Sequence, residues 1–168
     1  MTYYHYLAAD RKLPETVLGE KVRYMKFSEL PLPDDPGDIR NLLDPKDLEA
    51  MAEEMVPVYD TELDAVFVTV TPVDGDEADG LPVTKPFIHQ IDGIFEGDPE
   101  AVQKCAKELL GFLRSEFLPG EEVELYTCLS GEEDEARNEG LDRKINLQDP
   151  DLRVPLWFRD RQLVTLKR

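Results

Sequence analysis

The sequence predicts an α+β fold, in which a mostly antiparallel sheet carries two main helices, at about 45–55 and 99–118, on one face. Three observations predict this arrangement. One long segment has helical periodicity, most other apolar segments have the composition of strands, and strands and helices do not alternate one for one. A chain of 168 residues is also the size of one domain, which we expect to span residues 1–168.

The clearest element runs from Asp98 to Leu118. Asp98 suits the N-cap, Pro99 suits the first helical turn, and Pro119-Gly120 ends the helix. A helix of about 20 residues is roughly 30 Å long, which is enough to cross a whole sheet. Its apolar residues recur at the spacing of one helical face: Val102, Cys105, Ala106, Leu109, Phe112, Leu113 and Phe117.

Three strands and the shorter helix are expected in the first half of the chain. Residues 2–9 are aromatic and uninterrupted, 22–27 alternates along a strand, and 63–71 has two apolar faces that suit a central strand. Prolines make residues 30–45 an irregular connection. Asp44-Pro45 opens the helix at 45–55, whose apolar stripe is Leu48, Met51, Ala52 and Met55.

The second half of the chain supplies the remaining strands. Segments 87–95 and 122–129 have strand patterns, and Gly93 is expected to mark a bulge in the first of them. Residues 156–158 and 162–166 are expected to pair as a last hairpin. A short strand at 145–147 and a loop at 72–86 complete the prediction, together with a polar segment at 131–140 that is either a loop or a poor helix.

Charge is the unusual feature of this sequence. There are 37 acidic and 19 basic residues, which give a net charge of −18, yet residues 141–168 hold 4 acidic and 7 basic residues and carry +3. Such a field repels nucleic-acid phosphates and anionic membranes, so we expect neither as a direct partner. It attracts cations or a basic protein. An acidic coat also serves solubility, including in a salty cytoplasm, so the charge is open to a second interpretation.

Several further features favour a soluble cytoplasmic protein. No apolar run approaches the roughly 20 residues of a membrane span, and the N-terminus lacks the basic start and apolar region of a secretory signal. Two cysteines are too few for a disulfide scaffold. Cys105 lies on the helix and Cys128 in a strand, and we expect both to be reduced core residues.

The sequence contains none of the common catalytic or cofactor motifs. There is no GxGxxG, GxxxxGK[ST], GxSxG or HExxH, and no paired C-x-x-C or H-x-x-x-H for zinc. The acidic loop from Asp74 to Gly80 departs from a calcium loop, because Asp79 stands where glycine is required and Lys85 where glutamate is required. We therefore predict no catalytic residue, no cofactor and no metal site.

The candidates for ligand binding are histidines and the residues near them in the predicted sheet. Strand alternation puts Tyr4 and Tyr6 on one face of their strand, and Tyr3 and His5 on the other. Apolar surroundings raise the pKa of a thiol, which argues against a cysteine nucleophile. The candidate ligand-binding residues are His5, His89, Tyr4, Tyr6, Tyr126 and Cys128.

Two functional hypotheses from different classes follow. The first is a small, acidic, non-catalytic protein that binds a basic protein, in the way that acidic inhibitors and immunity proteins use charge. The alternative is an enzyme or small-molecule-binding protein with a pocket near His89, Tyr126 and Cys128. Adaptation to salt, with no bearing on function, is a third interpretation, and it predicts that added salt stabilises the fold. The sequence specifies neither a substrate nor an oligomeric state.

Overall fold

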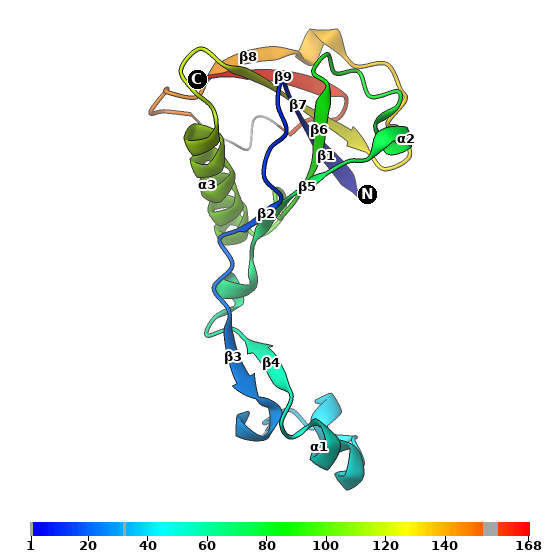
Figure 1. The fold of residues 1–168 in the computed structure, drawn as a ribbon, viewed down its shortest axis with the longest axis vertical. Helices are drawn as coiled ribbons and strands as arrows, with labels where there is room; N and C mark the ends of the chain where they lie inside the picture. The colour runs from blue at the N-terminus through cyan, green and yellow to red at the C-terminus, as the bar shows by residue number, and fades with distance from the viewer. Residues whose placement is uncertain (1, 32, 153–157) are drawn as a thin grey trace. The chain divides into compact units, whose positions relative to one another are not determined.

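The computed structural model describes residues 2–31, 33–152 and 158–168, and its ribbon is drawn in Figure 1. The chain divides into two compact units. The first combines the residues up to Glu20 with Val66–Arg168, and the second is Lys21–Ala65. The predicted α+β class is confirmed, because a mostly antiparallel sheet is accompanied by α-helices. One domain over residues 1–168 stays a prediction.

The sheet of the first unit has seven strands in the order β2-β5-β6-β1-β7-β9-β8. All neighbouring pairs are antiparallel except β8 and β9, which run parallel. The central strand β1 therefore lies between β6 and β7, which are distant from it in sequence (Figure 1). The strands are β1 (Tyr3–Ala9), β2 (Thr16–Leu18), β5 (Val68–Pro72), β6 (Phe87–Asp92), β7 (Glu122–Leu129), β8 (Arg143–Asn146) and β9 (Gln162–Lys167).

Some of these strands differ from their predicted form. The segment 63–71 begins as a 3-10 turn, η3 (Glu62–Ala65), and only its later part joins β5. Within the described residues, β9 pairs with β7 and β8. The hairpin predicted between 156–158 and 162–166 stays a prediction, because the first two residues of 156–158 lie outside the described part of the chain.

Helix α3 (Pro99–Glu116) lies against one face of this sheet (Figure 1). The Asp98 carboxylate accepts hydrogen bonds from the N–H groups of Glu100 and Ala101, at 3.1 and 2.8 Å, and so caps the helix as predicted. The predicted apolar face is buried, apart from the half-buried Val102. The core that it forms with the sheet includes Leu7, Ile91, Cys105, Leu109, Leu113, Leu125 and Val164.

The opposite face of the sheet is covered by the connection between β5 and β6. This connection contains α2 (Gly75–Ala78) and places Leu81 in a second buried cluster. The cluster consists of Tyr6, Leu81, Tyr126, Cys128 and Leu163. A short turn, η4 (Glu139–Leu141), precedes β8. The sheet is thus buried on both faces near its centre.

A buried carboxylate holds this covering connection in place. Glu124 on β7 is buried, and its two oxygens accept hydrogen bonds from the N–H and the hydroxyl of Thr84, both at 2.6 Å. Hydrogen bonds to a charged group are stronger than neutral ones, and a buried acceptor that loses its donors cannot turn to water instead.

We expect Glu124→Gln to lower the free energy of unfolding by about 1–3 kcal/mol, because it removes the charge that strengthens both bonds. The measurement is urea denaturation followed by circular dichroism. The matched control is Glu122→Gln on the same strand, where the carboxylate is partly exposed and the expected change is below about 0.5 kcal/mol. Equal losses in the two variants would contradict a specific role for the Thr84 contact.

The second unit is built without a buried side chain among its described residues. Its two-stranded antiparallel sheet pairs β3 with β4. A two-stranded sheet needs further packing to be stable in water. The elements of this unit are β3 (Arg23–Lys26), η1 (Phe27–Glu29), η2 (Ile39–Asn41), α1 (Pro45–Met51), β4 (Met55–Val58) and η3.

The helix expected at 45–55 is shorter in the structure. Its last turn tightens, because the N–H of Ala52 donates to the carbonyl of Glu49 and α1 ends at Met51. Met55 then begins β4, where pairing with β3 overrides the local helical pattern. No residue of α1 is buried, so its apolar stripe is only half covered, and α3 is the helix that supplies the core of the first unit.

Candidate binding sites

The six candidate residues fall on two opposite faces of the large sheet. The register pairs Leu7 with His89, so His89 shares the face of β1 that carries His5 and is covered by α3. The register between β1 and β7 pairs Tyr6 with Tyr126, so those two side chains share the opposite face. The structure therefore does not gather His89, Tyr126 and Cys128 around one pocket.

Tyr4, Tyr6, Tyr126 and Cys128 form a packed group beneath the covering connection. The rings of Tyr4 and Tyr6 meet edge to face, with centroids 6.3 Å apart. Burial raises the pKa of Tyr126 to about 12, and burial likewise raises the pKa of the Cys128 thiol to about 12. A thiol that stays protonated is a poor nucleophile. These residues contribute packing to the second cluster.

His89 has a structural role in the first core. It is buried, and its Nε2 accepts a hydrogen bond from the N–H of Leu13 at 3.1 Å. An accepting nitrogen requires the neutral ring, and burial lowers the pKa of His89 in agreement with this. The bond ties β6 to the segment between β1 and β2.

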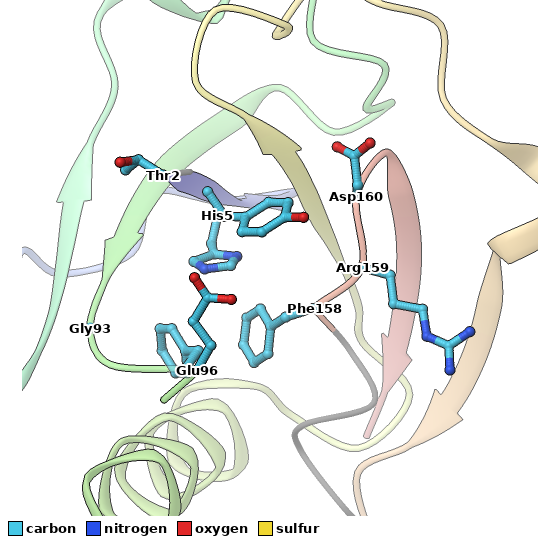
Figure 2. A pocket seen from close by; sticks show the side chains of 9 residues that line it. Thr2, His5, Gly93, Glu96, Phe158, Arg159 and Asp160 are labelled. Carbon is cyan, nitrogen blue, oxygen red and sulfur yellow. The ribbon is translucent and has the colours of Figure 1, made fainter. Parts of the chain in front are cut away.

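His5 lines a pocket of the first unit, which we call the His5 pocket (Figure 2). Its volume is about 470 Å³, within the range of small-molecule sites. The walls come from β1, from the loop between β6 and α3, and from the residues before β9. The lining residues are Thr2, Tyr3, His5, Gly93, Phe95, Glu96, Phe158, Arg159 and Asp160.

Gly93 lies where the chain turns at the edge of the His5 pocket. The strand expected at 87–95 ends at Asp92, and the chain then folds back so that Phe95 packs over Gly93. A Cβ at Gly93 would lie 3.0 Å from the Phe95 ring, which is tighter than most contacts of real side chains, so the ring would have to shift by a few tenths of an ångström. The predicted bulge is thus a strand end, and the close approach of Phe95 favours a residue without a side chain at position 93.

His5 is held by hydrogen bonding and by aromatic packing. Its Nδ1 lies 3.0 Å from Oγ1 of Thr127, directly across from it on β7. Its ring meets Phe95 and Phe158 edge to face, with centroids 5.2 and 4.5 Å away, while those two phenylalanines stack at 4.4 Å. His5 is 8% exposed, and burial lowers its pKa to about 4. The ring is therefore neutral at pH 7, with Nε2 as the nitrogen left for a ligand.

The charged groups of the His5 pocket are not equivalent. Asp160 accepts a hydrogen bond from the N–H of Leu129 at 3.3 Å and lies 3.5 Å from Nε of Arg161. Arg159 extends away from the His5 ring, whereas the Glu96 carboxylate points toward it (Figure 2). Within the described ranges, the Glu96 side chain has no hydrogen-bond or ion-pair partner.

The second unit presents a different candidate surface, an exposed apolar face of its two-stranded sheet. Tyr24 is opposite Pro57 and Lys26 is opposite Met55, so these four side chains share the face that we call the Tyr24 face. Tyr24 is 62% exposed and Met55 is 56% exposed. The unit that carries this face is acidic, since residues 21–65 hold 12 acidic and 5 basic residues and carry a net charge of −7. Large exposed apolar residues with a polar rim are typical of protein-binding surfaces.

Other kinds of site have little to support them in the described ranges. Among those residues, no group of three or more His, Cys, Asp or Glu is placed to hold a metal ion. Across the same ranges, each helix is too short or too polar to cross a membrane. Comparison of the chain with protein-family models, with curated proteins and with solved structures finds no match.

Proposed function

We propose that this chain is a non-catalytic, acidic binding protein that docks on a basic protein through the Tyr24 face. The observation that carries the proposal is the exposure of Tyr24 and Met55 in a unit that has no buried side chain among its described residues. Burying each of them in an interface would contribute about 1.5–3 kcal/mol, and tyrosine is common among the residues that dominate binding energy.

Charge supports the choice of a basic partner. The second unit carries −7 and the whole chain −18, so its field attracts a positively charged surface over distances comparable to the screening length. Such steering raises association rates and weakens as salt is added. The salt-adaptation interpretation makes a different prediction, because it links salt to the stability of the fold and not to partner binding.

Local chemistry supports a non-catalytic role. The two thiols are buried with raised pKa values, and the neutral His89 is occupied by a backbone hydrogen bond. Neither arrangement offers the nucleophile with an adjacent base that covalent catalysis uses. A cytoplasmic location forms part of the proposal and is supported by the two free, buried cysteines, Cys105 and Cys128.

The test is capture from a lysate of the source cell at low and high salt, with quantitative mass spectrometry. We expect a basic protein to be retained at low salt and released at high salt. The variant Tyr24→Ser/Met55→Ser should weaken its binding by roughly tenfold or more. The matched control is Leu118→Ser in the first unit, because Leu118 is 64% exposed and lies outside the Tyr24 face.

The proposal is wrong if no captured basic protein is both released at high salt and bound more weakly by Tyr24→Ser/Met55→Ser. A partner that is released by salt but binds the double serine variant as tightly as the parent would place docking elsewhere on the chain. Circular dichroism of the variants checks that each retains the secondary structure of the parent.

A further inference from the structure

We propose that the His5 pocket binds a guanidinium group, which pairs with Glu96, donates a hydrogen bond to Nε2 of His5 and lies against Phe95 and Phe158. This inference concerns the first unit and goes beyond docking at the Tyr24 face. It rests on three properties of the pocket: a free carboxylate, an uncharged acceptor and an aromatic wall.

The free carboxylate sets the charge of the ligand. Glu96 points toward the His5 ring and has no partner among the described residues, while Asp160 is already engaged (Figure 2). Arg159 extends away from the ring, so no cation within the described ranges neutralises Glu96. An anionic ligand would meet this carboxylate and the net charge of −18, whereas a cation is attracted by both.

The imidazole of His5 can accept a hydrogen bond from such a cation. It is more than nine-tenths buried, and its Nδ1 is occupied by Thr127 Oγ1 at 3.0 Å. When the Nδ1 proton is donated to the threonine hydroxyl, the lone pair of Nε2 is directed away from that bond. A neutral ring also avoids the repulsion that an imidazolium would exert on a cation.

The aromatic wall and the carboxylate together favour a guanidinium over an ammonium group. A guanidinium is planar, stacks on aromatic rings and offers two parallel N–H groups to one carboxylate. Phe95 and Phe158, themselves stacked at 4.4 Å, line the pocket next to Glu96. The volume of about 470 Å³ also leaves room for the aliphatic chain that carries the group. Both a free guanidino compound and an arginine side chain of a polypeptide contain this chemistry.

The experiment is a titration of the full chain with N-acetyl-arginine amide, followed by NMR signals of the imidazoles. The chain has only two histidines, so the His5 signal is readily distinguished from that of His89. We expect saturable shifts at His5, and binding of N-acetyl-citrulline amide at least roughly tenfold weaker, because citrulline keeps the planar shape without the charge. Equal binding of the two probes, or no shift at His5, would overturn the inference.

Variants at exposed carboxylates separate the pocket from the general field. Glu96→Gln should weaken binding of the arginine probe by roughly tenfold, because it removes the paired charge without changing the shape. Glu100→Gln, in the first turn of α3 and outside the pocket, is the matched control and should leave binding unchanged. Equal losses in the two variants would mean that only the overall field attracts the probe, and would overturn the assignment.

Two further arms identify the source of the guanidinium and keep the proposals distinguishable. If methylguanidinium binds as tightly as an arginine-containing peptide, the ligand is a small molecule. If the peptide binds much more tightly, the ligand is a polypeptide. Both results support the site. Tyr24→Ser/Met55→Ser should not change binding of the arginine probe. Loss of probe binding in Glu96→Gln therefore supports the pocket even where partner capture fails.

Discussion

Replacing Leu109 by alanine in the middle of α3 is expected to lower the free energy of unfolding by about 2–5 kcal/mol. Leu109 is fully buried in the core between α3 and the sheet, where it is surrounded by close-packed side chains. Truncation removes its transfer free energy and leaves a cavity that the neighbouring strands can only partly fill. A typical domain has about 5–15 kcal/mol of stability, so this one change removes a large share of it.

The measurement for Leu109→Ala is urea denaturation, with Leu118→Ala as the control. Leu118 comes just after the same helix but is exposed, so its truncation should cost less than about 0.5 kcal/mol. If Leu109→Ala lowers the free energy of unfolding no more than the control does, the face of α3 that carries Leu109 is not packed on the sheet. The assignment of the core would then be wrong.

Helix α3 shows what local sequence can predict. Its cap at Asp98, its opening proline and its apolar spacing all lie within one segment, and the structure confirms each of them. Local consistency of this kind needs no knowledge of the remaining chain. The class of the fold follows from the same kind of observation, because the order of strands and helices is also visible in the sequence.

Segments whose structure depends on distant partners were predicted less well. Met55 belongs to an apolar helical stripe in the sequence, yet in the structure it lies in β4 and pairs with Lys26 of β3. Local sequence does not indicate the short strand β2, because its three residues carry little pattern of their own and are held by pairing with β5. Helical and strand patterns compete over such short windows, and tertiary pairing decides between them.

The candidate site illustrates the same limit. Alternation separates His5 from Tyr4 and Tyr6 correctly, since these residues lie on one strand. Alternation within a strand cannot say which residues of β6 and of β7 lie on the same face of the sheet, because the register of each strand with β1 determines this. Local sequence does not indicate the His5 pocket, since Phe158 contacts His5 from more than 150 positions along the chain.

The pH dependence of stability provides a strong test of the His5 environment. Its pKa is about 4 in the folded protein, against an ordinary value of 6.5. Between these two values the unfolded chain binds a proton that the folded protein excludes, so stability falls as the pH falls from 6.5 toward 4. The stability from this group is fully present above pH 6.5, and about 3 kcal/mol of it is lost once the pH passes below 4.

Carboxylates also titrate in acid, so the contribution of His5 is taken as a difference between proteins. Compared with His5→Gln, the parent should lose about 2–3 kcal/mol more stability between about pH 7 and about pH 4.5. The charged groups facing the His5 pocket are Glu96, Arg159 and Asp160, and they are the same in both proteins.

Direct titration of the parent gives the second readout, which does not depend on how well the variant folds. The NMR signals of His5 should move with a midpoint near pH 4, because burial between Phe95 and Phe158 disfavours the charged ring. A midpoint near 6.5 would mean that water reaches the imidazole freely. In that case the ring would be charged in mild acid and would repel a cation, so the guanidinium site would lose its acceptor in the same pH range. The shape of this one titration curve therefore bears on both the packing around His5 and the ligand that its pocket takes.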